Sequence, residues 1–171
     1  GQAYFSYLVQ ELPQYLADAF GLSPQRSDTF IAGNSMGGYG AMKAALLHPE
    51  RYTAAASFSG ALSLEFLRAF PNDPRRPEFE LLFGNLERLS GSPHDPATWL
   101  RAAAVDPFRL PHLWISCARQ EDVYPLSGMF YQACRSLGIG ASYHEEDGKH
   151  DWIFWDVQIR RFLAEYLIPF P

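Results

Sequence analysis

Residues 30–40 carry the strongest structural signal in the chain: Phe30-Ile31-Ala32-Gly33-Asn34-Ser35-Met36-Gly37-Gly38-Tyr39-Gly40. It opens as a short apolar run with the length of a buried strand, passes through the pattern Gly-x-Ser-x-Gly, and continues into an alanine-rich segment that favours a helix. A sharp strand-to-helix turn strains the serine backbone and raises its hydroxyl above the sheet edge. The pattern predicts Ser35 as a nucleophile and the N–H of Met36 as an oxyanion donor. The alternative is a glycine-rich turn in which Ser35 only caps the helix.

Short apolar runs and helical segments alternate along the rest of the chain. Strands are expected at residues 29–32, 54–58, 113–117 and 142–144, and helices at 4–20, 39–48, 126–137 and 152–167. Pro13 is expected to kink or restart the first of these helices. Buried strands that alternate with helices are typical of a parallel sheet covered on both faces. The sequence therefore predicts an α/β fold.

Residues 61–111 differ from the rest, because prolines divide them into short helical pieces and no strand is expected there. We interpret this span as an excursion between two strands, of the kind that caps or borders a site. The length of 171 residues predicts a single domain around it.

A serine hydroxyl is a poor nucleophile until a base removes its proton, so a histidine is expected near Ser35. Of the five histidines, His150 lies in a polar loop between the last strand and the last helix. In an α/β sheet that loop lies at the carboxyl end of the strands, the edge that also carries the Ser35 turn. The sequence therefore predicts His150 as the general base, against the alternative of a solvated loop histidine.

The acid that orients the histidine is expected in the loop after the strand at 113–117, where Glu121 and Asp122 stand side by side. We favour Asp122, because it lies nearer the next helix and is followed by apolar residues, and Glu121 is the alternative. Serine, acid and histidine then follow one another in the chain order of the α/β-hydrolase triad.

Composition limits the other functional classes. Hydrophobic residues make up 47% and charged residues 19%, which excludes intrinsic disorder. With 14 basic and 19 acidic residues and no basic cluster, binding to nucleic acid or to an anionic membrane is not expected. The histidines and carboxylates at 144–150 match no metal-binding spacing, so no metal is expected. Cys117 and Cys134 are expected to be buried thiols.

These residues make the sequence resemble the esterase D-type branch of the α/β-hydrolase family, in particular the tributyrin esterases, with the S-formylglutathione hydrolases as relatives. The resemblance covers essentially the whole chain and rests on residues 30–40, 55–63, 121–124 and 150–155. It implies hydrolysis of small short-chain acyl esters through an acyl-enzyme, without metal or organic cofactor, by Ser35, His150 and Asp122. The acyl and alcohol pockets are expected to involve Tyr124, Trp152 and Phe58.

The family fold places several strands before the serine turn, and one of its N-terminal loops supplies a second oxyanion donor. Only one helix precedes the turn here, so residues 1–171 are expected to form the C-terminal two-thirds of one α/β-hydrolase domain. An unpaired strand edge at that point favours association, including a homo-oligomer. We expect little or no activity from this chain alone. Cytoplasmic placement is a default, because any export signal would lie upstream of residue 1.

Three other functions stay open at this point. One is a thioesterase of the S-formylglutathione hydrolase type, and another is a carbohydrate esterase that removes acetyl or feruloyl groups. The third is a binding protein on a hydrolase fold, in which a fluorophosphonate would not label Ser35.

Overall fold

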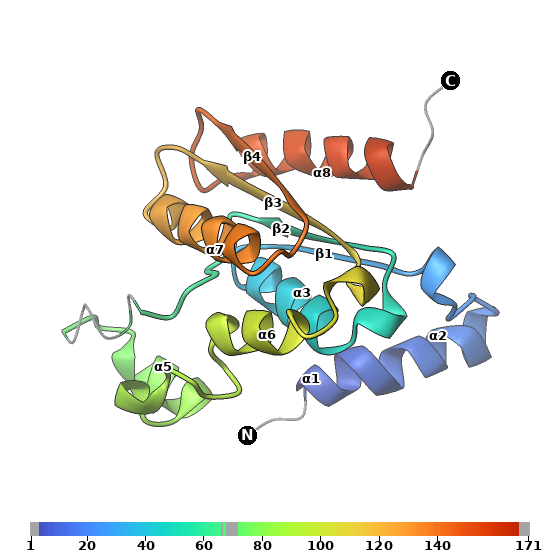
Figure 1. Cartoon of the computed structure of the whole chain (residues 1–171), viewed down its shortest axis with the longest axis horizontal. Helices are drawn as coiled ribbons and strands as arrows, with labels where there is room; N and C mark the ends of the chain where they lie inside the picture. Colours follow the sequence, from blue (N-terminus) through green and yellow to red (C-terminus); the bar gives the residue numbers. More distant parts are fainter. Residues whose placement is uncertain (1–3, 66, 68–71, 168–171) are drawn as a thin grey trace.

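The computed structural model describes residues 4–65, 67 and 72–167. Its centre is a sheet of four parallel strands that pair in sequence order: β1 (Phe30–Asn34), β2 (Ala54–Phe58), β3 (His112–Ala118) and β4 (Ala141–Glu146). Helices cover both faces (Figure 1), with α3 (Met36–Leu47), α6 (Pro96–Ala103) and α7 (Tyr124–Ser136) on one side and α8 (Trp152–Tyr166) on the other. The predicted α/β fold is confirmed.

The burial of each strand follows its place in the sheet. All of β2 is buried, and its sequence Ala-Ala-Ala-Ser-Phe carries small side chains that let helices approach closely. The edge strands β1 and β4 are largely half-buried. Within the described part of the chain, no strand pairs with the outer edge of β1, so backbone polar groups along that edge remain without a sheet partner.

Two apolar clusters hold the helices against the sheet. Complete burial of one large apolar side chain contributes about 1.5–3 kcal/mol, so these clusters dominate the favourable side of folding. The larger cluster lies between the sheet and α3, α6 and α7, and its buried members include Met42, Trp99, Leu113 and Phe130. The smaller cluster lies under α8 and includes Phe58, Trp114, Phe154 and Phe162.

The N-terminal helix is interrupted near the proline that the sequence singled out. The chain forms α1 (Tyr4–Ser6), a π-helical turn (Tyr7–Glu11) and α2 (Leu12–Phe20). Pro13 lies in the first turn of α2, and the π-helical turn directly before it changes the spacing of the hydrogen bonds where the proline lacks an N–H. Gly21 ends α2 with a left-handed φ of 65°. Short 3-10 turns follow at Arg26–Asp28 and Pro49–Arg51.

The proline-rich span 61–111 contains helical pieces. They are α5 (Arg76–Phe83), a 3-10 turn (Leu86–Arg88), α6, and a second 3-10 turn (Pro107–Arg109). A proline lies in the first turn of α5, of α6 and of the second 3-10 turn, where its fixed φ suits a helix and its missing N–H is not needed. Residues 66 and 68–71 lie outside the described residues.

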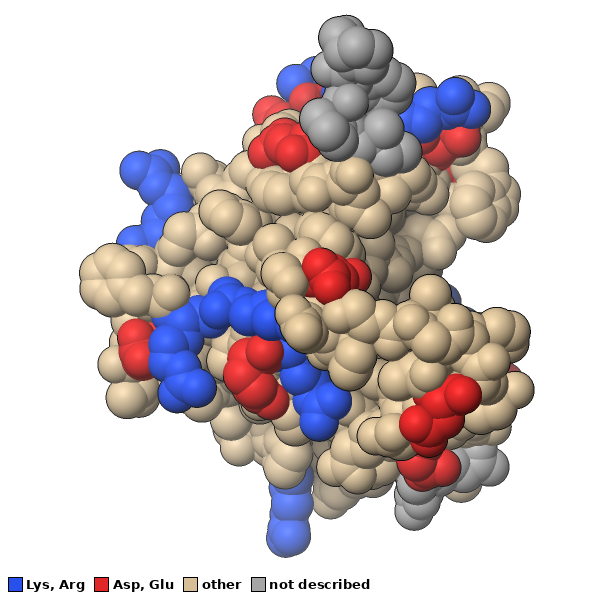
Figure 2. Space-filling view, turned by 90° about the vertical axis from the view of Figure 1, so that its right-hand side faces the viewer, with Lys and Arg blue, Asp and Glu red and all other residues tan. Residues whose placement is uncertain are grey.

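The surface mixes charges of both signs. On the face shown in Figure 2, Lys and Arg side chains lie next to Asp and Glu side chains. Among the described residues, no helix combines the length and the apolar character that crossing a bilayer requires.

Candidate active site

Ser35 stands alone between β1 and α3, in a sharper turn than the sequence predicted. Gly33 and Asn34 continue β1 because they pair with Ser57 and Phe58 of β2, and α3 begins directly after Ser35. The serine has φ 53° and ψ −122°, a backbone conformation that residues other than glycine rarely adopt. Its N–H donates to the carbonyl of Phe58 at 2.9 Å, which extends the sheet ladder to the end of the turn.

Two of the glycines around Ser35, Gly33 and Gly38, lie in close contact with neighbouring atoms. A Cβ on Gly33 would lie 2.3 Å from the carbonyl carbon and oxygen of Gly37, and one on Gly38 would lie 2.5 Å from Oγ of Ser57. No side chain fits at Gly33 against the Gly37 backbone, so the first glycine of the Gly-x-Ser-x-Gly pattern has a steric reason in this fold, whereas a Cβ on Gly37 would meet open space.

His150 meets Ser35 at the carboxyl edge of the sheet. Its Nε2 lies 2.9 Å from Oγ of Ser35, although 115 positions separate the two residues in the chain. The loop that carries His150 joins β4 to α8, and α8 is capped directly after it: Oδ1 of Asp151 accepts from the N–H groups of Ile153 and Phe154 at 3.0 and 3.2 Å. The cap fixes where the loop ends and therefore helps to hold the imidazole in place.

The acid beside the imidazole is Glu121. Its Oε2 lies 2.7 Å from Nδ1 of His150, and its side chain is fully buried. Its other oxygen, Oε1, accepts from the hydroxyl of Ser59 at 2.6 Å and from the N–H of Ala118 at 3.0 Å. A carboxylate only accepts hydrogen bonds, so Nδ1 carries the imidazole proton and Nε2 offers its lone pair to the Ser35 hydroxyl. These contacts offset the cost of burying the carboxylate.

The prediction that Asp122 orients the histidine is wrong. The chain turns sharply after β3, where the N–H of Glu121 donates to the carbonyl of Ala118 at 3.2 Å. That turn folds the Glu121 side chain back against the end of β3 and leaves Asp122 exposed. The apolar residues after Asp122, which favoured it in the sequence, belong to the start of α7.

The residues predicted to bind substrate differ in their surroundings. Phe58 is only 1% exposed and packs against Phe162 in the cluster under α8, so its assignment to a substrate pocket is wrong. Tyr124 is half-buried, and its hydroxyl donates to Glu145 at 2.7 Å, a bond that raises the pKa of the phenol. Trp152 is 66% exposed at the start of α8 and stays a prediction.

The N–H of Met36 opens the first turn of α3. N–H groups at a helix start have no acceptor within the helix. The carbonyl of Ser35 accepts from the N–H groups of Gly38 at 2.9 Å and of Tyr39 at 3.3 Å. The N–H of Met36 precedes both of these donors, at the first residue of α3. This N–H group and the positive end of the helix dipole can favour a negative oxygen beside Ser35.

Two residues that the sequence analysis missed join the acid loop to the histidine loop. Arg119 contacts Asp147 at 3.1 Å, and the guanidinium holds the pKa of that carboxyl below its usual range. Gln120 accepts from the N–H of Gly148 at 2.6 Å. Both follow β3 directly, and that position at the carboxyl edge was the one signal that could have found them.

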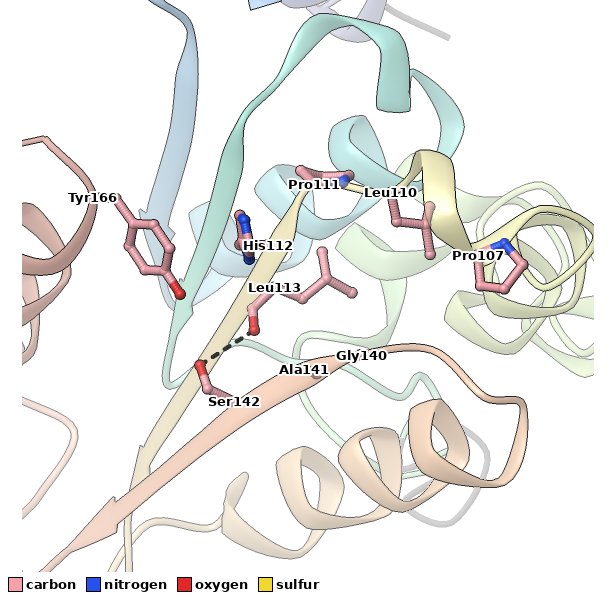
Figure 3. A pocket seen from close by; sticks show the side chains of 9 residues that line it. All are labelled: Pro107, Leu110, Pro111, His112, Leu113, Gly140, Ala141, Ser142 and Tyr166. Atoms are coloured by element: carbon pink, nitrogen blue, oxygen red, sulfur yellow. Dashed lines mark hydrogen bonds between the residues drawn. The ribbon is translucent and has the colours of Figure 1, made fainter. Parts of the chain in front are cut away.

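Two further features lie apart from this arrangement. His144 stacks on Trp114, with ring centroids 3.6 Å apart, and no group of three or more metal-ligating side chains occurs among the described residues. A pocket of about 370 Å³ lies at the opposite end of the sheet (Figure 3). Its lining includes His112 and Leu113 from the start of β3, Ser142 near the start of β4, and Tyr166 at the end of α8.

Known proteins resemble this chain over nearly its whole length. A family model described as "Putative esterase" matches residues 1–166. The acetyl esterase of Caldicellulosiruptor saccharolyticus is 27% identical over 164 residues, which are 92% of this chain and 62% of that protein. The apoenzyme structure of the S-formylglutathione hydrolase FrmB from Staphylococcus aureus is 31% identical, with a TM-score of 0.84 over 96% of this chain and 64% of that one.

A second solved structure extends the likeness. FphF, a fluorophosphonate-binding serine hydrolase of Staphylococcus aureus described with bound substrate, is 30% identical with a TM-score of 0.87. The match covers 98% of this chain and 65% of that one. The chain therefore spans slightly less than two-thirds of the length of these relatives.

Proposed function

We propose that this chain, which belongs to the esterase family of α/β-hydrolases, carries the catalytic residues of a serine carboxylesterase that acts on short-chain acyl esters. The observation that carries the proposal is the line of contacts from the Ser35 hydroxyl through the His150 imidazole to the buried Glu121 carboxylate. It joins a nucleophile, a base and an orienting acid at the carboxyl edge of a parallel sheet. The names of two relatives, acetyl esterase and S-formylglutathione hydrolase, each refer to a short acyl group, acetyl in the first and formyl in the second.

Acylation starts at the hydroxyl of Ser35. As Oγ bonds to the ester carbonyl carbon, Nε2 of His150 takes the hydroxyl proton and the carbonyl π electrons move to the carbonyl oxygen. The N–H of Met36 donates to this oxyanion. The carbonyl bond then re-forms, the bond to the alcohol oxygen breaks, and the leaving alcohol takes the proton from His150.

Deacylation repeats these steps with water as the nucleophile. His150 takes a proton from water as the water oxygen bonds to the acyl carbon, and it returns a proton to Oγ of Ser35 when the acid leaves. Throughout, Glu121 keeps Nδ1 protonated and stabilises the imidazolium that forms in each half.

Trp152 is the aromatic residue best suited to contact the substrate. Its side chain is two-thirds exposed, and its ring lies 5.4 Å from that of Trp155. The Trp155 ring in turn lies 4.9 Å from the imidazole of His150. We propose that Trp152 borders the pocket for the acyl or alcohol group.

A thioesterase of the S-formylglutathione hydrolase type is the second candidate, favoured by the 31% identity and TM-score of 0.84 to FrmB. Turnover of p-nitrophenyl acetate and butyrate, compared with that of S-formylglutathione, separates the two. A faster reaction with the thioester would reverse the order of the candidates.

The decisive test is covalent labelling with a fluorophosphonate, which needs one attack by the serine and therefore reports on slow enzymes as well. We expect a single adduct at Ser35, which the Ser35→Ala variant loses. Ser23→Ala is the matched control, because Ser23 is exposed and lies in the loop after α2. An unlabelled Ser35 in the folded protein would remove the esterase proposal and favour a binding protein on this fold.

A further inference from the structure

Four side chains, one of which is the buried acid Glu121, form a closed ring of contacts. Nε1 of Trp155 donates to Oγ of Ser59 at 3.0 Å, and the Ser59 hydroxyl donates to Oε1 of Glu121 at 2.6 Å. Oε2 of Glu121 accepts from Nδ1 of His150 at 2.7 Å. The ring closes where the indole of Trp155 meets the imidazole of His150 edge-on, with centroids 4.9 Å apart and planes at 84°.

The donors in this ring have only one consistent direction. An indole N–H can only donate, so Oγ of Ser59 must accept from Trp155. The single hydroxyl proton of Ser59 is then free to point at Glu121, whose carboxylate can only accept. The indole therefore orients the hydroxyl, and the hydroxyl in turn binds the oxygen of Glu121 that does not face His150.

Ser59 is held in this position by its backbone. It directly follows β2, is fully buried, and has φ 53°, in the region that non-glycine residues rarely adopt. Its N–H donates to the carbonyl of Ser116 on β3 at 2.7 Å. A buried serine in a strained conformation persists only where surrounding contacts compensate for the strain. Here the hydrogen bonds of Ser59 to Trp155, Glu121 and Ser116 provide that compensation.

We propose that Ser59, oriented by the indole of Trp155, is the positioning residue that fixes the rotamer of Glu121. With Oε1 held by Ser59 and by the N–H of Ala118, Oε2 faces Nδ1 of His150. The glutamate side chain has one more rotatable bond than an aspartate, so it needs such a partner to keep one orientation. This inference rests on the proposed esterase function for its kinetic consequence, although the ring itself exists without it.

The test removes the hydroxyl without adding strain. Glycine adopts φ 53° readily, so Ser59→Gly keeps the backbone while it removes the donor to Glu121. We expect fluorophosphonate labelling of Ser35 to slow about 10- to 100-fold, the effect of losing one hydrogen bond to a charged group. Trp155→Phe removes the indole N–H together with part of the ring volume, keeps the Ser59 hydroxyl, and should slow labelling by a smaller factor. Ser116→Ala is the matched control, because this serine is equally buried and its Oγ has no hydrogen-bond partner among the described residues.

A double-mutant cycle separates positioning from general loosening of the site. If Ser59 acts through Glu121, its removal should slow labelling in the parent protein and have no effect, or a favourable one, in a Glu121→Gln background. Equal slowing in both backgrounds would overturn the proposal. So would an unchanged rate in Ser59→Gly.

A spectroscopic measurement decides the inference even if Ser35 proves unreactive. A hydrogen-bonded imidazole N–H gives a downfield proton resonance, which the His150→Ala variant assigns by its loss. We expect Ser59→Gly to shift or broaden this resonance and Ser116→Ala to leave it in place. Failure of the parent protein to label would refute the esterase function alone. A resonance unmoved by Ser59→Gly would refute the positioning role alone.

Discussion

Exchanging Glu121 for glutamine should abolish most of the activity, and the hydrogen bonds around it explain why. Oε1 accepts from the Ser59 hydroxyl and the Ala118 N–H, so the amide oxygen of a glutamine takes that place. The amide NH₂ then faces Nδ1 of His150, which must accept instead of donate. The imidazole proton moves to Nε2, the atom 2.9 Å from Oγ of Ser35, and the base can no longer take the hydroxyl proton.

The magnitude follows from that change of tautomer. In serine hydrolases, the wrong tautomer with otherwise intact geometry lowers kcat about 10⁴-fold, or about 5.5 kcal/mol in the barrier. Asp122→Asn is the matched control, because it removes one carboxylate charge at the neighbouring, exposed position. We expect it to change the rate about twofold or less.

The assay compares hydrolysis of p-nitrophenyl acetate and the rate of fluorophosphonate labelling for the parent protein and both variants. Thermal unfolding of each variant checks that the fold is retained. A large loss in Asp122→Asn, together with near-normal rates in Glu121→Gln, would refute the assignment of Glu121 and restore the choice that the sequence favoured.

Three further predictions concern the fold. Gly33→Ala should destabilise the protein by about 1–3 kcal/mol or prevent folding, because the new Cβ meets the Gly37 backbone. Gly40→Ala is the control and should be neutral or stabilising, because a Cβ at Gly40 meets open space in a helix. Equal melting temperatures of the two variants would contradict this reasoning. Burial raises the pKa of the Cys117 and Cys134 thiols to about 12, so the folded state keeps two protons that the unfolded state releases above pH about 8.5. Stability to denaturant should therefore fall as the pH rises through that range, and less steeply in a Cys117→Ala/Cys134→Ala variant; an equal slope would disprove the effect. The open edge of β1 should make the purified chain self-associate at micromolar concentration, and sedimentation as a monomer at all concentrations would contradict this.

The sequence predicted features that depend on local patterns. The glycines, the short apolar run and the alanine-rich segment identified the strand, the turn and the helix around Ser35, because each acts through its immediate neighbours. The choice between Glu121 and Asp122 depended on how tightly the chain turns after β3, which adjacent carboxylates do not reveal. Phe58 was misassigned for a different reason: both faces of β2 are buried, so alternation along the strand could not tell which face points to the cluster under α8.

Ser35 and Ser59 use the same backbone device at neighbouring strand ends. Among the described residues they are the two non-glycine positions with positive φ, and both have φ 53°. Each donates its N–H to a carbonyl of the next strand, Ser35 to β2 and Ser59 to β3, and so extends the ladder while its positive φ redirects the chain. One hydroxyl then reaches the imidazole of His150 and the other reaches the carboxylate that orients it. The strain at the second serine is therefore best explained by the same requirement as at the first: a hydroxyl held above the edge of a parallel sheet, where the loops that carry the acid and the base meet.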